Sequence, residues 1–103
     1  MLAFEIHING KKRCVAGIGE PGVISTALSW VLRKPEGRGR RSEELELGVC
    51  GLISRTDENL EWLQRAMRLG DEVTIRIVEV ADADTPKKRR RDRATPAQIL
   101  RRK

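Results

Sequence analysis

Nine lysines and arginines near the end of the chain are the residues best suited to bind a charged partner. They are Lys87, Lys88, Arg89, Arg90, Arg91, Arg93, Arg101, Arg102 and Lys103. Cations in such a run neutralise phosphates and give binding that depends on salt and ignores base sequence. No aromatic residue lies among them, so stacking on bases is not expected. The run therefore indicates contact with nucleic-acid phosphates, docking on an acidic protein surface, or a tail that only aids solubility.

The net charge of +6 belongs to this segment and not to the whole chain. From Lys87 onwards there are nine Lys or Arg and a single acid, Asp92. Residues 1–86 hold twelve Lys or Arg and fourteen Asp or Glu, which makes them mildly acidic. An argument for a nucleic-acid partner therefore has to rest on the basic segment alone.

A glycine-rich segment at residues 17–22 reads Gly-Ile-Gly-Glu-Pro-Gly and matches the G-x-G-x-x-G pattern of dinucleotide-binding loops. Such a loop follows a buried parallel strand, and an acid about 20 residues later binds the ribose. Here the preceding apolar stretch belongs to a hairpin, Glu36 falls in a loop, and 103 residues cannot hold a six-stranded dinucleotide domain. We expect a connection between strands, and no cofactor.

The chain has one histidine, His7, and two cysteines, Cys14 and Cys50. These residues cannot supply four zinc ligands, so no metal site is expected. A Cys14–His7 nucleophile pair would lie on neighbouring strands, but the alternation sets the two side chains on opposite faces. Both cysteines lie in apolar runs and are expected to be free, buried thiols. We expect no catalytic residues and no enzyme activity.

Alternation of apolar and polar residues over 2–8 predicts a half-buried strand. The Asn-Gly pair that follows is the strongest short signal for a hairpin. A two-residue loop would place charged residues of the returning strand, 12–16, opposite the apolar face. A three-residue loop with a bulge places Cys14 opposite Ile6 instead, so we expect the longer loop.

Four further elements are predicted along the chain. Residues 23–33 fit either an amphipathic helix or a strand, and their Val, Ile, Thr and Trp content favours the strand. Residues 45–53 and 73–78 alternate as strands do. Residues 57–69 suggest a short helix, with a hydroxyl cap and two acids in its first turn, apolar residues at helical spacing and Gly70 at its end.

The fold class predicted from these elements is mainly β, a compact antiparallel sheet, sandwich or barrel of about five strands with one short helix at 57–69. The alternative is an α+β fold in which 23–33 is helical. Residues 1–82 form the domain, and residues 83–103 form a basic, flexible tail with a short helix over 96–102. The expected core is Phe4, Ile6, Leu28, Trp30, Leu47, Leu63, Ile75 and Ile77.

The chain resembles a set of small bacterial proteins without assigned function. The resemblance covers residues 2–80 and rests on Phe4–Gly10, Cys14–Gly17, Gly22–Ser25 with Trp30-Val31, and Leu69–Ile75. It implies a bacterial, cytosolic protein and carries no known site. The basic tail is not a feature of that set.

The function expected from the sequence is binding. One hypothesis is a small cytoplasmic protein-interaction module, of the accessory or immunity-type inhibitor class, held to one protein partner by its body. The other is a nucleic-acid-associated protein that binds phosphates through its basic tail. No apolar run reaches the roughly 18–20 residues that cross a membrane, so no membrane partner is expected. The oligomeric state is left open.

Overall fold

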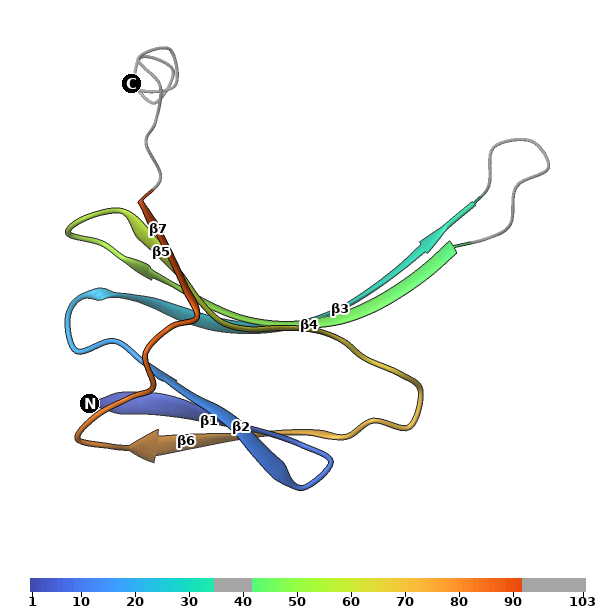
Figure 1. Ribbon diagram of the computed structural model, residues 1–103, viewed down its shortest axis with the longest axis horizontal. Coiled ribbons are helices and arrows are strands. Elements are labelled where there is room, and N and C mark those ends of the chain that lie inside the picture. Colours follow the sequence, from blue (N-terminus) through green and yellow to red (C-terminus); the bar gives the residue numbers. More distant parts are fainter. Residues whose placement is uncertain (35–41, 92–103) are drawn as a thin grey trace, which may run out of the picture.

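A computed structural model describes residues 1–34 and 42–91, and these residues form seven strands and no helix. The strands are β1 (Leu2–Ile8), β2 (Lys11–Gly17), β3 (Gly22–Arg33), β4 (Ser42–Ile53), β5 (Glu58–Ala66), β6 (Val73–Glu79) and β7 (Lys88–Arg91). They make two antiparallel sheets, with strand orders β2-β1-β6 and β3-β4-β5-β7, which lie as two layers in Figure 1. The mainly β fold is confirmed, and 23–33 is a strand. The expected count of about five strands was too low.

The β1–β2 hairpin has the expected pairing but not the expected loop. Ile6 lies opposite Cys14, as predicted. The turn is the two-residue Asn9-Gly10, with φ angles of 52° and 80°, because Ile8 pairs with Lys11. Such a turn matches the twist of the strands. The extra residue sits instead in a bulge beside Ile6 and His7, which brings the apolar residues of both strands to one face.

The prediction of a helix over 57–69 is wrong, because this segment contains β5, which forms a hairpin with β4. Asp57 takes a φ of 54° in the turn between them, so it does not start a helix. A bulge leaves Trp62 as an extra residue where Val49 pairs with Leu63 and Cys50 with Glu61. Buried side chains therefore fall at positions 60, 62, 63 and 67. Three of these positions, 60, 63 and 67, have the spacing of a helix face, which explains the error.

The core lies between the two sheets. Trp62, absent from the expected core, is the largest fully buried side chain and is only 2% exposed. It packs over Gly51, where an added Cβ would lie 2.9 Å from the indole ring and 2.9 Å from the carbonyl oxygen of Val23. The buried cluster comprises Ile6, Ile8, Cys14, Ala16, Leu47, Val49, Ile53, Leu60, Trp62, Leu63 and Met67.

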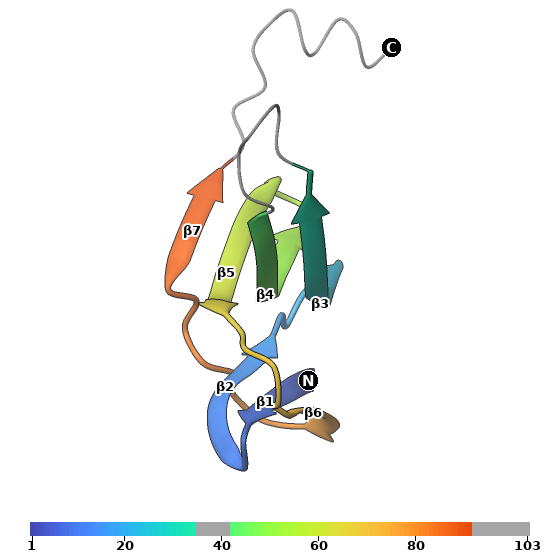
Figure 2. The ribbon, with the colours of Figure 1, turned by 90° about the vertical axis from the view of Figure 1, so that its right-hand side faces the viewer.

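Half of the expected core residues are exposed. Ile6, Leu47 and Leu63 are buried and Phe4 is half-buried, whereas Leu28, Trp30, Ile75 and Ile77 are 60%, 59%, 47% and 72% exposed. These four belong to β3 and β6, which are edge strands on the same side of the molecule (Figure 2). The alternation of apolar and polar residues assigned each of these four side chains to the correct face of its strand. The opposite sheet does not extend far enough to cover that face.

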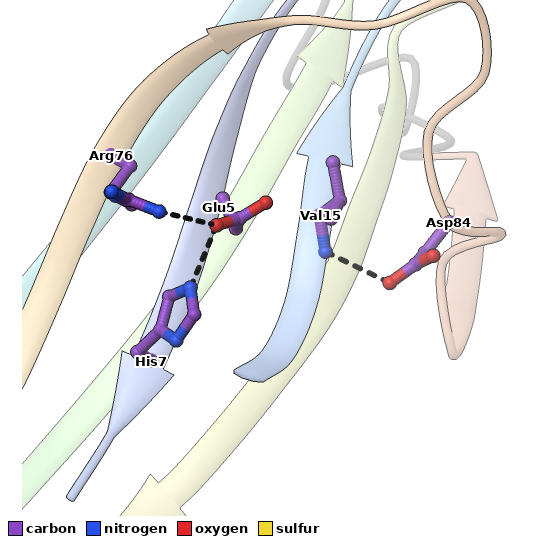
Figure 3. A network of polar contacts seen from close by, with 5 residues as sticks. All are labelled: Glu5, His7, Val15, Arg76 and Asp84. Carbon is purple, nitrogen blue, oxygen red and sulfur yellow. Dashed lines mark hydrogen bonds and ion pairs between the residues drawn. The ribbon is translucent and has the colours of Figure 1, made fainter. Parts of the chain in front are cut away.

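The segment after β6 joins the two sheets. The Asp84 N–H donates to the Val15 carbonyl oxygen (2.9 Å), and the Val15 N–H donates to Asp84 Oδ2 (2.8 Å; Figure 3). The indole N–H of Trp62 donates to the carbonyl oxygen of Asp84 (2.8 Å). The chain then enters β7, which pairs with β5. The segment expected to be a tail from residue 83 thus begins inside the fold; residues 92–103, with the helix expected over 96–102, lie outside the described part.

Candidate functional site

The first part of the basic segment is an edge strand of the second sheet. Within β7, Arg89 pairs bidentately with Glu58, at 3.0 Å from Nε to Oε2 and 3.2 Å from the guanidinium to Oε1. This hydrogen bonding, with a further bond from Thr56, holds the pKa of Glu58 below its usual value. Lys88 Nζ lies 3.9 Å from Glu61 Oε2. Two of the predicted partner-binding cations therefore contact the protein's own acids.

The other three cations of the basic segment that the structure describes are exposed to solvent. Lys87, Arg90 and Arg91 are exposed, and none of them forms an ion pair within residues 1–34 and 42–91. Arg90 pairs with Asn59 in the ladder, so both lie on the outer face of the sheet. A shallow cavity of about 340 Å³ opens there, lined by Cys50, Gly51, Asn59, Leu60, Glu61, Lys88 and Arg90. Arg93, Arg101, Arg102 and Lys103 lie outside the described residues.

His7 belongs to a polar network on the outer face of the first sheet. Its Nε2 lies 2.7 Å from Glu5 Oε1, and the Arg76 guanidinium lies 3.7 Å from the same oxygen (Figure 3). The hydrogen bond from His7 is the main cause that lowers the pKa of Glu5. Neither Glu5 nor Arg76 was among the residues predicted from the sequence. Glu5 and His7 occupy outward positions of the same strand, which the alternation indicates. Arg76 comes from β6, and the sequence does not show that β6 pairs with β1.

Cys14 and His7 lie on opposite faces of the first sheet, as predicted. Cys14 is buried opposite Ile6, and burial, with the nearby Asp84 carboxylate, raises its pKa to about 11. A thiol with this pKa is protonated at neutral pH and is a poor nucleophile. Cys50 is also free, but it is only half-buried and lies on the outer face of the second sheet, where burial raises its pKa. In the described ranges, no three His, Cys, Asp or Glu side chains cluster as metal ligands would.

The glycine-rich segment connects two strands, as expected. Gly17 ends β2 in the first sheet and Gly22 begins β3 in the second. Because a strand and not a helix follows, the loop has no helix N-terminus to hold a pyrophosphate. The described part of the chain contains no helix with the length and apolar character needed to cross a membrane.

Large apolar side chains are exposed where β3 and β6 are left uncovered. Leu28 pairs with buried Leu47, and Ile75 pairs with buried Ile6, so both face the interior side of their sheets. Figure 1 shows the far part of the β3–β4 hairpin rising away from the first sheet, which leaves this interior side open. We call this surface the open side; it comprises Phe4, Ile24, Leu28, Trp30, Ile75 and Ile77.

Two features shape the open side. A cavity of about 260 Å³ lies at one end, lined by Leu2, Phe4, Ile18, Glu20, Gly22 and Ile24. At the other end, the indole N–H of Trp30 donates to Glu43 Oε2 (2.8 Å), which orients the ring while leaving most of it in solvent. Apolar side chains grouped in this way, with an oriented tryptophan among them, are typical of surfaces that bind other proteins.

No protein-family model, no curated protein and no solved structure matches this chain.

Proposed function

We propose that this protein is a non-enzymatic binding module of the accessory or immunity-type inhibitor class, which recognises a protein partner through the open side. The observation that carries the proposal is the exposure of Leu28, Trp30, Ile75 and Ile77 on the interior faces of two edge strands. A partner that covers these side chains would stabilise the complex by about 25 cal/mol for each Å² of apolar surface removed from water.

A cytoplasmic location is part of the proposal. Two free cysteines, neither of them in a disulfide, fit a reducing compartment. The raised pKa values of both thiols also make them slow to oxidise, since the thiolate is the reactive form.

The proposal is tested with substitutions on the two faces of β3. The double variant Leu28→Ser, Trp30→Ser removes apolar surface from the open side. Val23→Ser with Val31→Ser is the matched control, because these valines are also exposed but alternate onto the outer face of the same strand. Partners captured from nuclease-treated extract are identified and then titrated as purified proteins by calorimetry. We expect the first variant to bind about 30-fold more weakly, as for the loss of a hot-spot tryptophan, and the control to bind normally.

Equal binding of both variants would contradict a role for the open side. Loss of all partners on nuclease treatment would instead favour the second candidate function, binding to nucleic acid.

The second candidate is supported by the free cations of the basic segment. If about five to seven phosphates are contacted, the logarithm of affinity should fall against the logarithm of salt concentration with a slope of roughly −4 to −6. We expect Arg90→Ser with Arg91→Ser to reduce this slope by about 2. Arg89→Ser is the control, because Glu58 already holds Arg89, and it should reduce the slope less. Titration of a labelled duplex measures both; no binding at low salt, or an unchanged slope in the double variant, would remove this candidate.

A further inference from the structure

Strand β3 is an unusually long and regular sheet edge. It pairs with β4 in unbroken register from Gly22 opposite Ile53 to Arg33 opposite Ser42. Its other edge faces no strand within the described residues. Between Gly22 and Leu32 it has no charged residue and no proline, and no bulge interrupts its ladder. Exposed edges usually carry such features, because they prevent another strand from adding to the sheet.

The other three edges of the two sheets have this protection. β7 is four residues long and entirely cationic. β2 begins Lys-Lys-Arg, and Asp84 occupies the hydrogen-bonding groups of Val15 at its edge. β6 carries Arg76 and Glu79 within seven residues. Among the four edge strands of the described sheets, β3 alone therefore lacks the features that prevent another strand from pairing with it.

We propose that β3 pairs antiparallel with β3 of a second copy of this chain, which joins the two four-stranded sheets into one eight-stranded sheet. A two-fold axis at Ala27, the middle of the neutral stretch, places the residues near the axis against the same residues of the second copy, so a charge there would meet a like charge. The neutral stretch of β3 meets this requirement, and a four-cation strand such as β7 does not. Self-pairing therefore fits the charge pattern of the edge.

Pairing of this kind uses the backbone groups of the edge and leaves both faces of the sheet free. Trp30 and Leu28 of the two copies would lie on the same face of the continuous sheet, so two open sides would adjoin. The inference goes beyond the proposed function and is separate from it, because it concerns the edge of β3 and not the side chains that a different protein would cover.

The test is the oligomeric state of the purified full chain, measured by sedimentation over a range of micromolar concentrations. Ala27 is exposed on the outer face of β3 and opposite Gly48, so a longer side chain has room there. We expect the wild type to be a dimer and Ala27→Lys to dimerise at least tenfold more weakly, because like charges then meet at the junction. Thr74→Lys is the control; it adds the same charge to the exposed edge strand β6 and should leave the dimer intact.

A charge-exchange experiment separates a lost interface from a lost fold. Ala27→Glu alone should also weaken the dimer, and an equimolar mixture of Ala27→Lys and Ala27→Glu should restore it as a heterodimer. The inference is overturned if the wild type is monomeric throughout, if Ala27→Lys dimerises normally, or if the mixture stays monomeric. A monomer that still binds its protein partner through the open side would overturn only this inference and leave the proposed function standing.

Discussion

Ending the chain after Asp82 is expected to lower the melting temperature by roughly 10–25 °C. This truncation removes Asp84 and with it three hydrogen bonds that link Val15 of the first sheet to Trp62 of the second. The buried indole N–H is left without a partner, which costs about 1–3 kcal/mol, and the pairing of β7 with β5 is lost as well. In a domain of this size, each kcal/mol shifts the melting temperature by about 4–8 °C.

The matched control ends the chain after Arg91, which keeps every one of these contacts. Thermal unfolding followed by circular dichroism compares the two truncations with the full chain. Melting temperatures that agree to within a few degrees for both would mean that residues 83–91 are a detached tail, as the sequence suggested.

Replacing Trp62 with alanine is expected to reduce the free energy of unfolding by about 3–5 kcal/mol. The ring fills the centre of the core over Gly51, and its N–H is bonded to Asp84. The loss would be a large part of the 5–15 kcal/mol that stabilises a typical domain. Urea denaturation of the purified variant measures it.

The chain contains its own control for this prediction in its second tryptophan. Trp30 is 59% exposed, so Trp30→Ala should change the free energy of unfolding by no more than about 0.5 kcal/mol. Equal destabilisation by the two substitutions would show that the open side is covered by the protein itself and would contradict the arrangement of β3.

Much of the sheet structure could be predicted because strand alternation is local. Residues 2–8, 45–53 and 73–78 alternate with a period of two, and each lies in a strand. The pairing of Ile6 with Cys14 was also predicted, because the apolar pattern fixes the face of the hairpin. The extra residue was wrongly assigned to the turn, since the sequence does not show that it lies in a bulge within the ladder.

The failures arose where distant parts of the chain decide the outcome. A bulge at Trp62 moved the buried face of β5 by one residue and produced the spacing of a helix. Alternation placed Leu28 and Ile77 on the interior faces, but it does not reveal whether another sheet covers them. The basic run looked like a solvated tail because its partners, Glu58 and Glu61, lie about thirty residues earlier in the chain.

The strand order of the first sheet also determines how the chain must fold. β3, β4 and β5 pair with one another in sequence order, so this meander can close locally before β7 is added to β5. The first sheet needs β6 to return to β1, with Leu2 opposite Glu79, across nearly the whole described chain. The entropic cost of closing that long loop falls on one step, so we expect completion of the first sheet to be the slow event in folding. Until it occurs, the interior face of the meander lacks its complete opposite layer, and we expect the newly made protein to be most prone to aggregation in this interval.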